Sequence, residues 1–257
     1  MNPSLTRTLI ALGAAEFLVG VDEYSATTEP AVEGLPRVGG LLNPSLEAVL
    51  ALNPDLVVLV PSVAQRDFRS RLSDLGVEVL GLPNLSFDEL LESIQALGDR
   101  VGRCEAARQR IAAIRSAWSE VAQAASSRPR RSAILIIQRD PLYVAGAGSY
   151  LNTMLEATGL DNVAGKYSES YPRISLEWLI AVGPDVIVDS TDDPISAPAY
   201  WSQWPSIPAV ANGRVVPVQE GIVTLPGPYI DRSLQNLAEA IESEATALDS
   251  SSKEASK

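Results

Sequence analysis

The most informative absence in this chain of 257 residues is histidine, which does not occur at all. Without it, the chain cannot form a Ser-His-Asp or Cys-His catalytic site, a histidine-ligated zinc site or an axial histidine ligand to haem iron. Cysteine is nearly absent too, because Cys104 stands alone and excludes an internal disulfide or a cysteine-cluster metal site. Cys104 lies in the helical stretch 99–109, where we expect an inert thiol. We therefore predict no catalytic residue and no metal site.

Positive charge and long apolar runs are also scarce. With 20 basic against 32 acidic residues, the net charge is −12, which argues against binding nucleic acid or anionic lipid. No apolar run reaches the roughly 20 residues of a membrane span. Residues Met1–Ser4 show neither the basic segment nor the cleavage site of a signal peptide. The 46% of hydrophobic residues nevertheless suffices for a real core.

The chain does contain a long internal repeat. Segment Ser45–Val58 returns as Ser175–Val188, with matching Ser, Leu, Glu, Ala, Pro, Asp and Val at one offset, since 177 − 47 = 130 and 185 − 55 = 130. A constant offset between long matching segments indicates two similarly built lobes. Each copy is typical of a serine-capped helix followed by a buried strand. The repeat therefore places Glu47 and Glu177 at the same point of both lobes.

Helix and strand patterns alternate on both sides of a long helical stretch, which predicts α/β lobes with parallel sheets. In the first lobe we expect helices over 4–12, 45–52 and 68–75, strands over 18–21, 56–60 and 77–82, and a polar loop over 22–30. In the second lobe we expect strands over 133–138, 142–144, 186–188 and 215–218, and helices over 150–158, 175–182 and 228–242. The glycine turn Ala145–Gly148 has no lysine after it, so a tight turn is preferred over a phosphate loop.

The stretch between the lobes begins with a capping box, Ser86–Glu89. Its apolar spacing predicts helix without any strand before Arg131, and Gly98 and Gly102 can divide it into two helices. We expect four regions: an N-terminal lobe (1–85), a connecting backbone helix (86–130), a C-terminal lobe (131–242) and a polar, disordered tail (243–257).

Several of these segments together resemble one family. They are Arg37–Gly40 followed by Asn43–Val58, the capped helix from Ser86, the glycine turn before Ser149, Tyr171–Glu177 and Gly227–Pro228. They are similar to the substrate-binding proteins of ABC importers for cobalamin, haem and ferric siderophores. The resemblance implies a class III periplasmic binding protein fold, in which a long rigid helix joins two Rossmann-like lobes. It also implies a periplasmic or cell-surface monomer that is not an enzyme, needs no cofactor, binds a corrinoid or iron chelate, and works with an ABC permease dimer and its ATPase.

Members of that family begin with a strand directly before the equivalent of Asn2–Ser4. We therefore expect the first strand of the N-terminal lobe, and a secretion leader, to be missing from this sequence. The alternative is a lobe that has lost a sheet member. That loss should be costly, because central strands of a parallel sheet are buried on both faces.

The resemblance also assigns site residues. Glu47 and Glu177 match the glutamates that dock into arginine pockets on the two permease subunits; the simpler reading is a carboxylate that stabilises the helix dipole. The ligand should lie in a cleft between the lobes, where the loops 37–42 and 60–65 add further wall. The expected ligand contacts are Glu23, Tyr24, Gly39, Gly40, Tyr143, Tyr171, Trp201 and Glu220. Aromatic rings suit a broad, partly apolar ligand, and their hydroxyl groups can bond its polar edges.

The ligand and two other functions stay open. Tyr229 stands where the family usually has an arginine, with Arg232 as a possible replacement, so an anionic ligand is slightly less favoured than a corrinoid. An alternative is a two-lobed enzyme, either a chelatase or a nucleotide-sugar-dependent transferase, using carboxylates such as Asp22, Glu23 or Asp140. A receptor-derived protein that only binds a partner is the third possibility.

Overall fold

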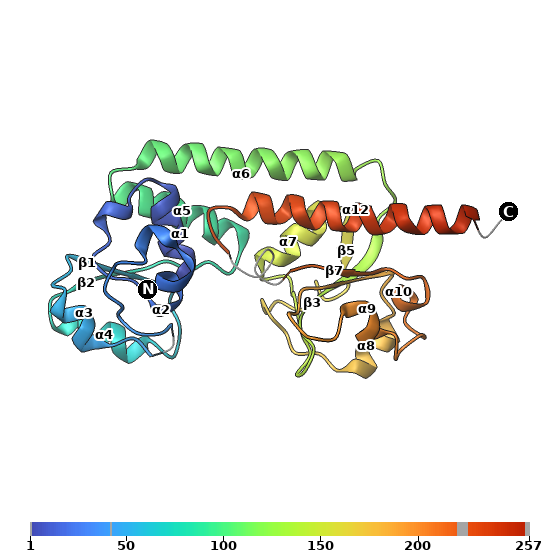
Figure 1. Cartoon of the computed structure of the whole chain (residues 1–257), viewed down its shortest axis with the longest axis horizontal. Coiled ribbons are helices and arrows are strands. Elements are labelled where there is room, and N and C mark those ends of the chain that lie inside the picture. Colours follow the sequence, from blue (N-terminus) through green and yellow to red (C-terminus); the bar gives the residue numbers. More distant parts are fainter. Residues whose placement is uncertain (1, 42, 220–225, 255–257) are drawn as a thin grey trace. The chain divides into compact units, whose positions relative to one another are not determined.

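The computed structural model describes residues 2–41, 43–219 and 226–254 and divides the chain into two compact units (Figure 1). Unit 1 comprises residues 1–84 and 88–112, and unit 2 comprises residues 85–87 and 113–257. The division runs through one long helix, α6 (Cys104–Ala125), which contributes residues to both units.

Unit 1 is a small α/β unit with a two-stranded sheet. Its elements are α1 (Pro3–Ala11), η1 (Ala15–Phe17), α2 (Glu23–Thr28), η2 (Pro30–Val32), α3 (Leu46–Ala51), β1 (Leu56–Leu59), α4 (Arg66–Asp74), β2 (Glu78–Gly81) and α5 (Phe87–Arg100). Strands β1 and β2 pair in parallel, from Leu56 opposite Glu78 to Leu59 opposite Gly81. A cluster of buried apolar side chains, among them Val49 and Val57, packs helix α3 against this sheet.

Two expectations for unit 1 were wrong. The predicted strand over 18–21 is not formed, since only Val21 makes an isolated bridge, to Arg37. The predicted loop over 22–30 contains helix α2 instead. Asp22 starts this helix, because its two carboxylate oxygens accept hydrogen bonds from the backbone N–H and the hydroxyl of Ser25 at 2.9 and 2.7 Å.

The predicted helical stretch between the lobes consists of two helices, α5 and α6. They are separated at Gly102, whose φ of +67° lies in the left-handed region that glycine adopts without steric cost. The expected division by glycine is therefore confirmed. Helix α5 begins directly after Ser86, as the capping box predicts.

Unit 2 has a larger sheet. Its elements besides α6 are β3 (Arg131–Gln138), β4 (Tyr143–Val144), α7 (Tyr150–Ala157), β5 (Leu160–Asn162), α8 (Leu176–Val182), β6 (Val186–Asp189), α9 (Ala197–Trp201), α10 (Pro208–Ala211), β7 (Val215–Pro217) and α12 (Ile230–Glu254). The strand order is β4-β3-β6-β7, and β5 pairs with β3. All pairs are parallel except β3 with β4. Strand β6 is buried along its whole length, as expected for a strand with neighbours on both sides.

Helix α12 continues to Glu254, so residues 243–254 of the predicted polar tail are helical. The run Ile230–Glu254 contains no glycine or proline and is rich in alanine, glutamate and leucine, all strong helix formers. An ion pair of 2.8 Å between Arg128 and Glu242 also ties this helix to the end of α6.

Candidate functional site

The two copies of the repeat form the same local structure. In each, a serine hydroxyl caps a short helix: Ser45 accepts from the backbone N–H of Ala48 at 3.1 Å, and Ser175 from that of Trp178 at 3.2 Å. The helices also end alike. Asn53, with φ of 45°, and Gly183, with φ of 59°, take the left-handed conformation that terminates a helix ahead of proline.

Glu47 and Glu177 both lie exposed in the first turn of these helices. The backbone N–H of Glu177 and the Ser175 hydroxyl lower the pKa of the Glu177 carboxyl below its ordinary value. This carboxylate is therefore ionised at neutral pH and open to a cationic partner. It also has a favourable interaction with the N-terminal end of α8.

Unit 1 brings four of the predicted ligand contacts together. The backbone N–H of Glu23 donates to the carbonyl oxygen of Gly39 at 3.1 Å, and the Glu23 carboxylate lies 3.7 Å from the position that a Cβ on Gly40 would take. Tyr24 follows Glu23 on α2 and is 47% exposed. The backbone itself requires glycine at position 39, because Gly39 has a φ of +97° and the nearby backbone of Asn43 leaves no room for a side chain.

The two wall loops of unit 1 add exposed apolar side chains that the sequence did not single out. Leu41 is 43% exposed and Val63 is 81% exposed. Gln65, which is 2% exposed, fastens the loops to each other, since its side-chain amide donates to the carbonyl oxygen of Leu41. Like Tyr24, the exposed Leu41 and Val63 offer contact area for a broad, partly apolar ligand.

In unit 2, Tyr143 and Tyr171 come from segments that lie side by side. Tyr143 bridges to Arg173, and the backbone N–H of Val144 donates to the carbonyl oxygen of Pro172 at 3.2 Å. Burial raises the pKa of Tyr171 to about 12, although 37% of the residue stays exposed. The Tyr171 phenol therefore stays protonated at neutral pH and can donate a hydrogen bond.

The glycine turn of unit 2 packs closely against the segment 167–172. A Cβ on Gly146 would lie 2.1 Å from the carbonyl oxygen of Glu169, and a Cβ on Gly148 would lie 2.5 Å from that of Ser168. No side chain fits at either distance. The glycines therefore allow the strand that carries Tyr143 to approach the segment that carries Tyr171.

Two predicted ligand contacts are not supported by the structure: one lies outside the described residues and the other is buried. Glu220 lies outside the described residues. Trp201 is 1% exposed, and its indole N–H donates to the Asp189 carboxylate at 2.6 Å. A large aromatic side chain in a proline-flanked segment is compatible with a rim or a core position, and only packing distinguishes them. We therefore remove Trp201 from the ligand contacts.

The partners of Trp201 form a buried polar network that sequence reasoning missed. Arg139 and Asp189 lie at the ends of the neighbouring strands β3 and β6 and pair at 3.0 Å, with side chains 5% and 0% exposed. The Arg139 guanidinium also lies 4.5 Å from the ring centre of Tyr200. The available signal was a charged residue at the carboxyl end of two apolar strands, an edge where parallel sheets place their sites.

Of the carboxylates weighed for catalysis, Asp22 has a structural role. Asp22 is 1% exposed and occupied as the cap of α2. The described part of the chain contains no group of three His, Cys, Asp or Glu residues that could hold a metal ion. Within the same residues, no helix combines the length and the hydropathy needed to cross a membrane.

Comparison with known proteins gives matches along most of the chain. The family model described as periplasmic binding protein matches residues 1–220. An ABC transporter substrate-binding lipoprotein of Bacillus subtilis is 30% identical over 250 residues, which cover 94% of this chain and 78% of that protein. A cobalamin-binding protein of Halobacterium salinarum is 29% identical over 256 residues, covering 93% of this chain and 68% of that protein.

Solved structures with lower identity share the fold. The periplasmic vitamin B12 binding protein of Vibrio cholerae superposes with a TM-score of 0.80 at 22% identity, covering 95% of this chain and 96% of that one. A periplasmic haem-binding protein from Roseiflexus sp. RS-1 superposes with a TM-score of 0.78 at 22% identity, covering 95% and 97%. The expected fold class is confirmed, and the enzyme alternative has no support among these relatives. The chain therefore belongs to the periplasmic binding protein family, the substrate-binding proteins of ABC transporters.

Proposed function

We propose that this protein captures a corrinoid outside the cytoplasmic membrane, in the periplasm or at the cell surface, and delivers it to the permease dimer of an ABC importer. The observation that carries the proposal is that Tyr24, Leu41 and Val63 of unit 1 are exposed apolar or aromatic side chains. Side chains of this kind suit a broad ligand with an apolar surface and polar edges. The identity of 29% with a cobalamin-binding protein supports the same ligand class.

The polar groups of the proposed contacts favour a corrinoid over an anionic chelate. The Glu23 carboxylate lies beside Gly40, where it would repel a ligand carboxylate and accept hydrogen bonds from amide groups. Tyr171 offers a neutral hydroxyl, because burial keeps its pKa near 12. Arg232 is stacked 4.8 Å over the ring of Tyr229, which occupies its charge with an aromatic face. Haem and ferric siderophores are the alternative ligands.

For docking, we propose that Glu47 and Glu177 each bind a cationic pocket on one permease subunit. The exposed carboxylates stand at equivalent points of two equivalent helices. A two-fold symmetric partner offers two equivalent pockets, which a duplicated helix can match. A carboxylate that serves only its own helix dipole would not need to recur on both units.

Calorimetric titration with cyanocobalamin, haemin and a ferric hydroxamate siderophore tests the ligand. We expect cyanocobalamin to bind with the highest affinity and the double variant Tyr24→Ala/Tyr171→Ala to bind it at least tenfold more weakly, about 1.4 kcal/mol. Phe17→Ala is the matched control, because Phe17 is an aromatic side chain of similar exposure (54%) outside the proposed contacts. A protein that binds none of the three ligands would refute the proposal.

Uptake of radiolabelled cyanocobalamin by proteoliposomes that contain the permease and its ATPase tests the docking. Glu47→Arg/Glu177→Arg should abolish uptake and leave the ligand affinity unchanged, because like charges placed against each other at an interface cost several kcal/mol. The control is Glu120→Arg/Glu239→Arg, which changes the net charge equally at two exposed helix positions. Undiminished uptake by the first double variant would leave the glutamates with a helix-stabilising role only.

A further inference from the structure

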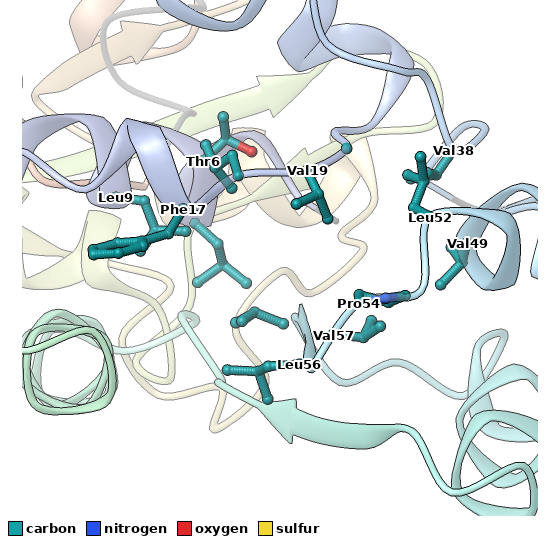
Figure 2. A pocket seen from close by; sticks show the side chains of 14 residues that line it. Thr6, Leu9, Phe17, Val19, Val38, Val49, Leu52, Pro54, Leu56 and Val57 are labelled. Atoms are coloured by element: carbon teal, nitrogen blue, oxygen red, sulfur yellow. The ribbon is translucent and has the colours of Figure 1, made fainter.

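Two exposed apolar side chains, Phe17 in unit 1 and Ile195 in unit 2, have different surroundings. Phe17 and Val19 border an apolar cavity of about 90 Å³ within unit 1 (Figure 2), whose lining includes residues of helix α1, of the segment 17–20 and of strand β1. In Figure 2, side chains of α1 and of this segment face those of β1 across the empty space. Ile195 is equally exposed, at 54%, but it lies on the loop 190–196 between β6 and α9.

The loop 190–196 has a counterpart in unit 1. By the offset of 130, β6 corresponds to β1, so the loop that follows β6 corresponds to the wall loop 60–65 that follows β1. Each loop carries a strongly exposed apolar side chain, Ile195 in unit 2 and Val63 in unit 1. Both loops leave the carboxyl end of their strand, the edge at which open α/β sheets bind ligands.

A buried polar side chain fastens each of these loops. In unit 1, the Gln65 amide donates to the carbonyl oxygen of Leu41. In unit 2, the Arg139 guanidinium donates to the carbonyl oxygen of Ile195 at 2.7 Å and lies 3.5 Å from the Asp193 carboxylate. That carboxylate accepts from the backbone N–H of Ile195 at 2.8 Å. The backbone of Ile195 is therefore held at both its N–H and its carbonyl group, while its side chain stays exposed.

Arg139 is itself held from inside unit 2. Its Nε donates to the Asp189 carboxylate at 3.0 Å, and its guanidinium lies 4.5 Å from the ring centre of Tyr200. The same carboxylate accepts from the Trp201 indole at 2.6 Å. Because the N–H groups of a guanidinium point in fixed, different directions, one side chain can bond both Asp189 and Ile195. Arg139 thus connects the buried end of β6 to the exposed loop.

The proposed contact Tyr143 lies at the same edge of the sheet. It stands opposite Gln138, the last residue of β3, on the side of β4. On the other side of β3, strand β6 pairs as far as Asp189, and the loop 190–196 follows. Arg139 comes directly after Gln138, between the two. Tyr143 and the loop therefore flank the carboxyl end of β3.

Resting on the proposed function, we propose that Ile195 is a ligand contact of unit 2 and that Arg139 is the positioning residue that holds it in place. Ile195 supplies an aliphatic contact for the apolar surface of a corrinoid, as Val63 does in unit 1. A large aliphatic side chain gains free energy when a ligand removes it from water. A contact whose backbone is already held also loses less conformational entropy on binding.

Calorimetric titration of the full chain with cyanocobalamin, haemin and a ferric hydroxamate siderophore tests the contact. For the ligand that the parent chain binds, Ile195→Ala should weaken binding about fivefold, because it removes most of the aliphatic area that the ligand covers. Ile195→Leu should retain the affinity. The matched control is Leu75→Ala, because Leu75 is an aliphatic side chain of similar exposure (58%) outside the proposed contacts.

Arg139→Lys separates positioning from stability. Lysine keeps a positive charge beside Asp189, but it lacks the fork that bonds Asp189 and Ile195 together. Without ligand, we expect cooperative unfolding to be retained and the amide hydrogens of the loop 190–196 to exchange on the order of tenfold faster. Ligand affinity should fall about as much as in Ile195→Ala. The double variant should bind no more weakly than Ile195→Ala alone, because both substitutions remove the same contact.

The outcomes distinguish this inference from the proposed function. A parent chain that binds one of the three ligands, and does so equally well as Ile195→Ala, would overturn the contact and leave the proposed function intact. Unchanged exchange of the loop in Arg139→Lys would overturn the positioning role, whether or not a ligand binds. A parent chain that binds none of the three ligands would refute the proposed function and, with it, the ligand contact of Ile195.

Discussion

The helix–strand step of unit 1, from Ser45 to Leu59, and that of unit 2, from Ser175 to Asp189, share seven of fifteen residues and the same local structure. Their surroundings differ. Strand β6 has a neighbour on both sides and is buried throughout, whereas β1 pairs with β2 and borders a cavity. The difference teaches that the repeated sequence fixes caps and element boundaries, while burial depends on which strands stand beside it.

The last residue of β1 and that of β6 differ most in chemistry. A substitution at this point is expected to have the largest effect on stability. Where unit 1 has the buried Leu59, unit 2 has Asp189, paired with Arg139. Arg139→Ala leaves a buried carboxylate without its cation, and we expect it to lower the free energy of unfolding by about 3–5 kcal/mol. Denaturant unfolding followed by tryptophan fluorescence measures it, since all four tryptophans, 118, 178, 201 and 204, lie in unit 2.

The double variant Arg139→Met/Asp189→Leu, which borrows the leucine of unit 1, should recover part of this loss. The recovery will be incomplete, because the Trp201 indole and the Thr191 hydroxyl both lose their acceptor. A loss below 1 kcal/mol in Arg139→Ala would mean that water or another cation compensates the carboxylate.

An identical substitution at equivalent positions of β6 and β1 sharpens the comparison. Val188 is 0% exposed, whereas Val58 is partly buried. Val188→Ala should lower the free energy of unfolding by about 2–3 kcal/mol and Val58→Ala by about 1 kcal/mol or less, since only the first leaves an enclosed hole. Amide hydrogen exchange, measured separately for unit 1 and unit 2, shows how much stability each substitution removes from its own unit. Equal losses would show that β1 is as well packed as β6.

The helix caps should behave alike in both units. Ser45→Ala and Ser175→Ala each remove one hydroxyl that accepts a backbone N–H, at 3.1 and 3.2 Å. We expect each to cost about 1 kcal/mol, with Thr replacements retaining most of the stability. A difference of more than about 1 kcal/mol between the two sites would break the local equivalence that the repeat predicts.

The smallest expected difference between the units is in how much stability each loses at alkaline pH. Tyr24 is the only tyrosine in unit 1, whereas unit 2 contains Tyr171, whose pKa is raised by burial to about 12. As pH rises above 10, the unfolded chain releases the phenolic proton first and the folded chain retains it, so stability falls between pH 10 and 12. Tyr171→Phe should reduce this loss, and equal slopes for the two proteins would refute the assignment. Amide hydrogen exchange or tryptophan fluorescence, at constant ionic strength, measures the stability at each pH.

Much of the fold and part of the site could be predicted from the sequence. The serine caps, the stop at Gly102 and the boundaries of β1 and β6 follow from signals within a few residues of each other. The grouping of Glu23 and Tyr24 with the Gly39 turn followed from a resemblance and is compatible with the hydrogen bonds of unit 1.

The failures share one cause, which is that pattern alone does not reveal the neighbours of a segment. The run 18–21 has β-forming residues but no strand beside it in the described structure, so only Val21 bridges. Trp201 was expected at a surface, yet its indole is buried against Asp189. Val63 and Leu41 were ordinary loop residues in the sequence, and only the structure shows how exposed they are.

By itself, the sequence determined two α/β lobes with equivalent capped helices, the exposed glutamates that those helices present, and the exclusion of histidine-based catalysis and of cysteine-cluster metal sites. These features depend on short-range hydrogen bonds and on composition. Only the tertiary structure decided which strands are enclosed, which aromatic side chains remain open to a ligand, and where unit 1 leaves an apolar cavity. Burial arises from contacts between segments far apart in the chain, and a local sequence pattern does not predict these contacts.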